Sequence, residues 1–202
     1  MSAHYNILIL FAHPRFERSR ANRQLVRHIP RSERLTFHDL YERYPDFNVN
    51  LSYEKHLLSR HDIIIWHHPF YWYGAPPLLK QWIDISLEFG WAYGPGGAAL
   101  RDKIFFNAIT SGGSREAYTH EGHHRFTVQE FLTPFRRTAT LCHARYWPPF
   151  AVHGTHRIDD AGLLEQARLY RRLLARLLDG DFDPDAVEQY PYLNDWLTQT
   201  QG

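Results

Sequence analysis

The sequence predicts an α/β fold in which a parallel β-sheet is covered by helices on both faces. Apolar runs of strand length alternate along the chain with segments of helical periodicity, as in chains that wind a parallel sheet. The runs over 5–11 and 62–67 are also almost continuously apolar, which is typical of strands buried on both faces. With 202 residues, the chain suits one main domain.

Five segments carry the strand pattern. The first and third are the apolar runs already named, and the second, over 34–40, is weaker. A fourth covers 103–110. The fifth, over 145–153, is interrupted by Pro148 and Pro149, so we expect a broken strand. The predicted strands cover 5–11, 34–40, 62–67, 103–110 and 145–153.

Helices are predicted between these strands from their capping residues and prolines, over 20–29, 52–59, 76–87, 128–142 and 160–179. Ser19 caps the first helix, and Pro30 follows its end. Pro134 lies inside the 128–142 segment and should kink it. The last helix starts at an Asp pair and ends at Gly180. It has an apolar stripe on one side and a row of arginines on the other, which we expect to face water. These arginines are Arg168, Arg171, Arg172 and Arg176.

Composition excludes several classes of protein. The net charge of +1 argues against a nucleic-acid partner, and the single cysteine, Cys142, permits neither an internal disulfide nor a thiolate metal cluster. No apolar run reaches the ~20 residues that span a bilayer. Residues 1–6 lack the features of a signal peptide, so we expect a cytoplasmic protein. His120, His123 and His124 lack a fixed fourth ligand, and we predict no metal site.

The loop after the first strand distinguishes between two ways of winding the sheet. A dinucleotide-binding Rossmann sheet needs a Gly-x-Gly-x-x-Gly loop there, but residues 12–22 contain no glycine. They offer the capping Ser19 and free N–H groups at a helix start, with His13, Arg15, Arg18 and Arg20 nearby. This combination predicts an anion site and favours the flavodoxin-like strand order 2-1-3-4-5.

Two further loops carry unusual residues. Four consecutive aromatic residues, 70–73, lie between prolines and a glycine, and at least one ring should be free to pack on a flat ligand or in a dimer contact. After the fourth strand, Gly112 and Gly113 permit close approach to a planar ring. Tyr118 and His124 follow with a phenol and an imidazole. In the 2-1-3-4-5 order, the loops after strands 1, 3 and 4 are neighbours and converge on one site.

These motifs resemble the NAD(P)H:quinone oxidoreductase (DT-diaphorase) family of flavoproteins. The matching segments are A-H-P and S-x-A-N in 12–22, H-P-x-x-W-Y in 68–73, P-x-L-L-K-x-W-I-D in 76–84, G-W-A-Y-G in 90–94 and T-S-G-G in 110–113. Within the family, the segments 38–48 and 147–153 are most similar to the ancillary flavoproteins of glutathione-gated potassium-efflux antiporters.

The resemblance implies a flavodoxin-like homodimer that transfers hydride from NADH or NADPH to a quinone-like acceptor. FMN is the implied cofactor, although the arginines of the first loop would also suit FAD. Tyr118 and His124 are the implied catalytic pair. The implied flavin-binding residues are His13, Ser19, Arg20, Ala21, Asn22, Phe70, Tyr71, Trp72, Tyr73, Thr110, Ser111, Gly112 and Gly113. The alternative is a regulatory subunit of a potassium-efflux antiporter, with a structural or sensory flavin site.

Residues 181–202 extend beyond the short ancillary proteins of this resemblance. We therefore divide the chain into a flavin-binding domain, 1–180, and a C-terminal extension, 181–202. Its aromatic residues predict that the extension wraps a partner subunit or covers the site.

Overall fold

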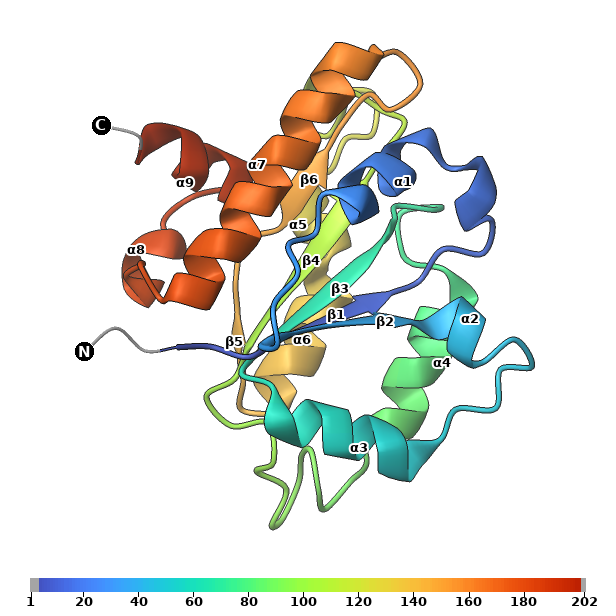
Figure 1. The fold of residues 1–202 in the computed structure, drawn as a ribbon, viewed down its shortest axis with the longest axis vertical. Helices are drawn as coiled ribbons and strands as arrows, with labels where there is room; N and C mark the ends of the chain where they lie inside the picture. The colour runs from blue at the N-terminus through green and yellow to red at the C-terminus, as the bar shows by residue number, and fades with distance from the viewer. Residues whose placement is uncertain (1–3, 201–202) are drawn as a thin grey trace.

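A computed structural model of the chain, which describes residues 4–200, contains a six-stranded parallel sheet (Figure 1). The strand order is β2-β1-β3-β4-β5, with β6 also paired to β4. This order confirms the predicted flavodoxin-like fold. The strands are β1 (Ile7–Phe11), β2 (Leu35–Asp39), β3 (Ile63–Pro69), β4 (Ile104–Thr110), β5 (Arg145–Tyr146) and β6 (Phe150–Val152).

The fifth strand is broken, as predicted. Its two pieces, β5 and β6, pair with opposite ends of β4, and Trp147, Pro148 and Pro149 lie between them. Proline has no backbone N–H to donate to the ladder, so hydrogen bonding is interrupted there.

Helices cover both faces of the sheet (Figure 1). One face carries α1 (Arg20–Arg27) and α7 (Asp160–Asp179), and the other α3 (Leu51–Arg60), α4 (Pro77–Ser86), α5 (Val128–Phe131) and α6 (Thr133–Leu141). The remaining helical turns are η1 (Phe16–Arg18), α2 (Leu40–Arg43), η2 (Arg115–Ala117), α8 (Pro184–Val187) and α9 (Leu193–Gln199). Within residues 4–200, no helix is long and apolar enough to cross a membrane.

The predicted helix over 128–142 consists of two helices, α5 and α6, with Leu132 between them. A capping box formed by Thr127 and Glu130 starts α5. Pro134 lies in the first turn of α6, where its missing N–H costs nothing. The proline therefore starts a new helix instead of kinking one.

The C-terminal extension packs on its own chain as far as residue 200, and residues 201 and 202 lie outside the described part. Its side chains Val187, Leu193 and Trp196 are buried in the core beneath α1 and α7. Of the four α7 arginines, Arg168, Arg171 and Arg172 are exposed as predicted, whereas Arg176 is half-buried, which corrects the expectation for that residue. The Arg176 guanidinium lies 4.3 Å from the centre of the Trp196 ring, and Arg172 donates a hydrogen bond to the Leu197 carbonyl.

Candidate flavin and active site

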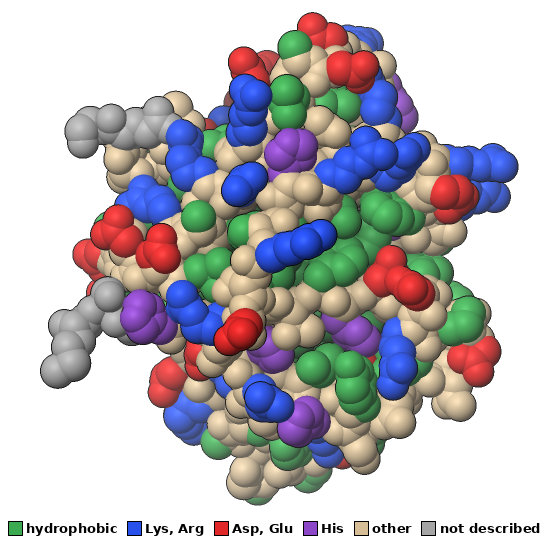
Figure 2. All heavy atoms as spheres, viewed as in Figure 1, with side chains coloured by type: hydrophobic (Ala, Val, Ile, Leu, Met, Phe, Trp, Pro, Cys, Tyr) green, Lys and Arg blue, Asp and Glu red, His purple; other side chains and the backbone are tan. Residues whose placement is uncertain are grey.

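A pocket of about 840 Å³ opens where β1, β3 and β4 end. Parallel α/β sheets bind ligands at this edge, where the strand order reverses. Its walls come from the loops after β1 and β3, the end of β4, and the loop between β6 and α7. Figure 2 shows Lys and Arg side chains gathered over η1 and the start of α1, beside this edge.

The start of α1 forms one end of the pocket. Ser19 Oγ accepts hydrogen bonds from the backbone N–H and the side-chain amide of Asn22, at 3.2 and 3.0 Å. The same amide donates to Thr110 Oγ1 at 2.9 Å. Because both hydroxyls accept from Asn22, their own protons are available to donate into the pocket. Among residues 4–200, no acceptor bonds the N–H groups of Arg20 and Ala21. These donors together suit a phosphate.

Asn22 is held from behind by two buried side chains. Its Oδ1 accepts from His67 Nε2 at 3.2 Å, and Tyr170 donates to His67 Nδ1 at 3.3 Å. Burial lowers the pKa of His67 to about 3, so the ring is neutral and one nitrogen donates while the other accepts. We call Tyr170, His67, Asn22, Ser19 and Thr110 the polar chain, which runs from α7 to the pocket.

His13 adds a further donor to this end of the pocket. Its Nδ1 accepts the backbone N–H of Arg15 at 3.1 Å, which leaves the proton of a neutral ring on Nε2. Burial lowers the pKa of His13, so the neutral form predominates at pH 7. The side chains of Arg15 and Arg18 are exposed at the pocket and supply positive charge.

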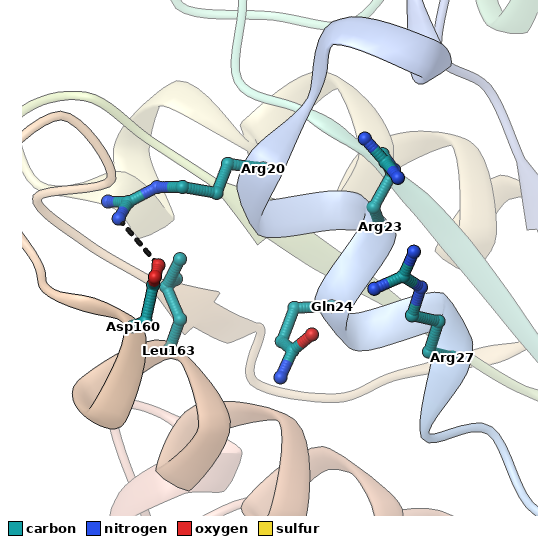
Figure 3. A pocket seen from close by; sticks show the side chains of 6 residues that line it. All are labelled: Arg20, Arg23, Gln24, Arg27, Asp160 and Leu163. Atoms are coloured by element: carbon teal, nitrogen blue, oxygen red, sulfur yellow. Dashed lines mark hydrogen bonds and ion pairs between the residues drawn. The ribbon is translucent and has the colours of Figure 1, made fainter.

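Arg20 lines the pocket, and its guanidinium bonds to the loop that forms the opposite wall. It pairs with Asp160 at 2.9 Å (Figure 3). It also donates to the carbonyls of Thr155 and Ile158. Behind this ion pair lies a separate hollow of about 360 Å³, beside the outward side chains Arg23 and Arg27 of α1. Of the predicted site residues, only Arg20 lines that hollow.

The aromatic loop after β3 divides between the pocket and the surface. Phe70 and Tyr71 line the pocket, whereas the Trp72 side chain is 94% exposed. Trp72 and Tyr73 both have positive φ values, 47° and 64°, and Gly74 N–H donates to the Tyr71 carbonyl. This is the backbone of a type I′ turn, which disfavours bulky residues and costs roughly 1 kcal/mol or more at each. Such strain is more common at functional sites than elsewhere.

Tyr118 and His124 lie together beyond the lining of the pocket. Their rings stack with centroids 4.3 Å apart, and the Tyr73 hydroxyl lies 3.4 Å from His124 Nδ1. A Cβ on Gly113 would lie 3.0 Å from both rings, so only glycine fits beside them unless the rings move. Burial raises the pKa of the Tyr118 phenol. The pKa of His124 is lowered, mainly by desolvation and to a smaller extent by the charge of His123. Both side chains are therefore neutral at pH 7.

The structure brings most, but not all, of the predicted residues into one pocket. Those lining it are His13, Ser19, Arg20, Ala21, Asn22, Phe70, Tyr71, Thr110 and Gly112. Trp72, Tyr73, Ser111, Gly113, Tyr118 and His124 do not line it. Among residues 4–200, no three His, Cys, Asp or Glu side chains are grouped to hold a metal ion.

Sequence reasoning missed one wall of the pocket, the loop of residues 155–159 between β6 and α7. The available signal was its position after a strand that pairs with β4, because the carboxyl ends of neighbouring parallel strands meet at one edge. The break in the fifth strand obscured that position.

Comparison with known proteins agrees with this architecture. Residues 5–174 match the family model Flavodoxin_2, described as a flavodoxin-like fold. The glutathione-regulated potassium-efflux system ancillary protein KefF of Salmonella gallinarum is 44% identical over 170 residues, 84% of this chain and 96% of that protein.

Two solved structures are also similar. General stress protein 14 of Treponema denticola, in complex with FMN, superposes with a TM-score of 0.80 at 35% identity and covers 85% of this chain and 99% of its own. The NADPH-quinone reductase from P. pentosaceus gives 0.76 at 29% identity, covering 84% and 97%. The chain therefore belongs to the Flavodoxin_2 family of flavodoxin-like proteins.

Proposed function

We propose that this chain is a flavin-dependent NAD(P)H oxidoreductase that reduces quinones or related electrophiles by two-electron hydride transfer. The observation that carries this proposal is the pocket itself, in which a cluster of anion donors meets Phe70 and Tyr71 of the aromatic loop after β3 and Gly112 after β4. The FMN complex of one relative and the quinone-reductase name of another support it.

The residues present fit FMN, which combines a phosphate with a flat ring. The polar chain, His13 and the first N–H groups of α1 would hold the phosphate. Phe70, Tyr71 and Gly112 line the pocket and would flank the ring. Gly113 lies beside Tyr118 and His124 instead, where a Cβ would contact both side chains. Arg15 and Arg18 would complete the charge balance, and they could equally contact the pyrophosphate of FAD.

A bound flavin would supply the hydride chemistry, and the chain would position and polarise the reactants. The Tyr118 phenol stays protonated at neutral pH and can donate a hydrogen bond to a quinone oxygen. The neutral His124 imidazole can donate from one nitrogen beside it. We assign Tyr118 and His124 as the catalytic residues of both half-reactions, the reduction of the flavin by NADH or NADPH and the reduction of the acceptor.

We also propose that the protein is a homodimer. Trp72 and Phe126 are 94% and 53% exposed, and Tyr71 and Tyr73 are each 44% exposed. Phe131 contacts both Tyr73 and Phe126, so these rings lie on one part of the surface. Exposed aromatic clusters of this kind are typical of interfaces. Trp72 lies next to Tyr73, which contacts His124, so an interface there would cover one side of the candidate active site.

A second candidate function is supported by the 44% identity with KefF, which covers 96% of that ancillary protein. Here the chain would be a cytoplasmic regulatory subunit that binds a potassium-efflux antiporter. Its flavin site would then serve a structural or sensory role. Retention of a detergent-solubilised antiporter on the immobilised protein would support this function. Retention by the flavin-free protein would show that antiporter binding does not depend on flavin catalysis.

The first function is tested by the absorbance spectrum of the purified protein after incubation with FMN or FAD and desalting. We expect retained flavin absorbance that bleaches when NADH or NADPH is added without oxygen, and that returns when a quinone follows. A protein that retains no flavin would contradict the proposal. Retained flavin that neither donor bleaches would favour the regulatory function.

A further inference from the structure

The C-terminal extension contacts the loop that carries Tyr118 and His124. The family match ends at residue 174, inside α7, so α8 and α9 lie outside it. The relative that is 44% identical aligns over 96% of its own length with only 84% of this chain. The extension is therefore an addition to the shared fold, and its contacts are features of this chain.

Helix α9 is anchored firmly to the core. Leu193 and Trp196 are buried against the α7 side of the sheet. The Asn194 side chain accepts from the Ala151 N–H at 2.9 Å and donates to the Ala151 carbonyl at 3.1 Å. The Asn194 amide thus caps the free edge of β6 as a neighbouring strand would. The extension offers a fixed platform beside the candidate site.

From this platform, α9 holds the start of the loop through an ion pair. Both carboxylate oxygens of Asp195 accept from Arg115, at 2.7 Å each, and the guanidinium lies 4.5 Å from the Tyr192 ring centre. The paired geometry is the strongest that arginine makes with a carboxylate, and this bonding raises the pKa of Arg115. Arg115 starts η2, and its carbonyl accepts from the N–H of Tyr118.

A second contact reaches Tyr118 from the other side. The Tyr192 ring lies edge-on to His153, at 5.6 Å between centroids, and His153 lies 5.7 Å from Tyr118. His153 Nδ1 is 3.0 Å from Ser111 Oγ, and that hydroxyl donates to the Gly113 carbonyl. Tyr192 thus packs against His153, which in turn contacts the Ser111 hydroxyl that bonds to the Gly113 carbonyl beside Tyr118 and His124.

We propose that α9 is a brace for the catalytic loop, with Asp195 and Tyr192 as positioning residues for Tyr118 and His124. This inference rests on the proposed function for its effect on turnover. The loop, residues 111–127, contains only one short helical turn, and most of its side chains beyond η2 are exposed. A loop of this kind gains order mainly from contacts at its ends, and misplacement of a catalytic group by about 1 Å can cost a hundredfold in rate.

The test is Asp195→Ala in the full chain, with Asp185→Ala as its matched control. Asp185 lies in the same extension and pairs with Arg145 at 2.6 Å, away from the loop. We expect Asp195→Ala to lower kcat for p-benzoquinone about tenfold, with an FMN Kd within about twofold of the wild type. The control should leave kcat unchanged. The exchanged pair Arg115→Asp with Asp195→Arg should recover much of the lost turnover.

Amide hydrogen exchange tests the brace without any assay of turnover. We expect faster exchange over residues 115–124 in Asp195→Ala than in the wild type or Asp185→Ala. Unchanged exchange would overturn the brace, even if the protein proves to be a quinone reductase. Faster exchange in a protein that binds no flavin would leave the brace standing and refute the proposed function. Equal losses of kcat in both variants would reduce Asp195 to a general stabilising role.

Discussion

The two ends of the candidate site are held in different ways. At the phosphate end, the polar chain lies inside the fold, and Asn22 and His67 are almost completely buried. At the ring end, Tyr118 and His124 belong to a surface loop whose start is tied to the C-terminal extension. On the proposed function, cofactor affinity would depend on residues in the core, whereas turnover would depend on contacts made at the surface. Changes at one end should therefore leave the other end intact.

Low pH should lower the free energy of unfolding of the protein, and with it the order of the phosphate end. Burial lowers the pKa of His67 to about 3 and that of His68 to about 4. In the unfolded chain both bind protons below about pH 6.5. Their neutral burial therefore stabilises the fold fully above pH 6.5, and this contribution is lost as the pH falls toward 4. The loss is on the order of 3 kcal/mol for each histidine.

Urea unfolding at pH 7, 5.5 and 4.5 would measure this loss as a falling free energy of unfolding. His67→Gln should flatten the dependence on pH. His56→Gln alters an exposed histidine of α3 and should leave it unchanged. A free energy that stays constant over this range would contradict neutral burial.

The next largest effect concerns the ring end. Replacing Tyr118 with Phe and His124 with Gln together should lower quinone reduction at least about tenfold, because the phenol donor is lost and the imidazole is replaced by an amide that does not exchange a proton. FMN affinity should not change, since neither residue lines the phosphate end. His120→Gln is the control, because His120 lies in the same loop but pairs with Glu130. Steady-state rates equal to the wild type would remove the pair from catalysis.

At the phosphate end, Asn22→Ala should lower FMN affinity about tenfold, because the Ser19 and Thr110 hydroxyls lose the amide that orients them. Riboflavin, which lacks the phosphate, should bind with unchanged affinity. Gln24→Ala removes a similar amide from the outer side of α1 and provides the control. Fluorescence titration with both ligands measures the difference. Parallel losses for FMN and riboflavin would show that Asn22 supports the fold and not the phosphate.

The smallest effect should come from the far end of the polar chain. Tyr170→Phe removes the hydroxyl that donates to His67, and we expect a loss of FMN affinity of about threefold. The variant keeps the ring packing, so turnover at saturating FMN should be that of the wild type. Tyr190→Phe, at a half-buried tyrosine in the extension, is the comparison variant. Equal FMN affinities in the two variants would show that Tyr170 does not contribute to phosphate binding and that the polar chain begins at His67.

The fold could be predicted almost completely from the sequence because β1 and most of β3 are almost continuously apolar and several helices have clear caps. Ser19 and Asp159 cap α1 and α7, and Gly180, with a φ of 66°, ends α7. These local signals act within a few residues and need no tertiary information. The break at Leu132 was the main error, because Pro134 can either kink a helix or start one.

The candidate site was less predictable, because much of it depends on contacts between distant residues. His67 joins Asn22 to Tyr170, a connection that no sequence spacing reveals. Arg176 resembles a solvated helix residue until Trp196 folds back beneath it. The loop of residues 155–159 enters the pocket because β6 pairs with β4, a partnership hidden by the short broken strand.

In the proposed function, the start of α1 binds the phosphate of a flavin. The most direct test of this binding is a parallel titration of the wild-type protein with FMN and riboflavin, followed by the quenching of flavin fluorescence. We expect FMN to bind at least about tenfold more tightly, because charge-assisted hydrogen bonds to the phosphate are lost in riboflavin. Equal affinities for the two ligands, or no binding of either, would contradict it.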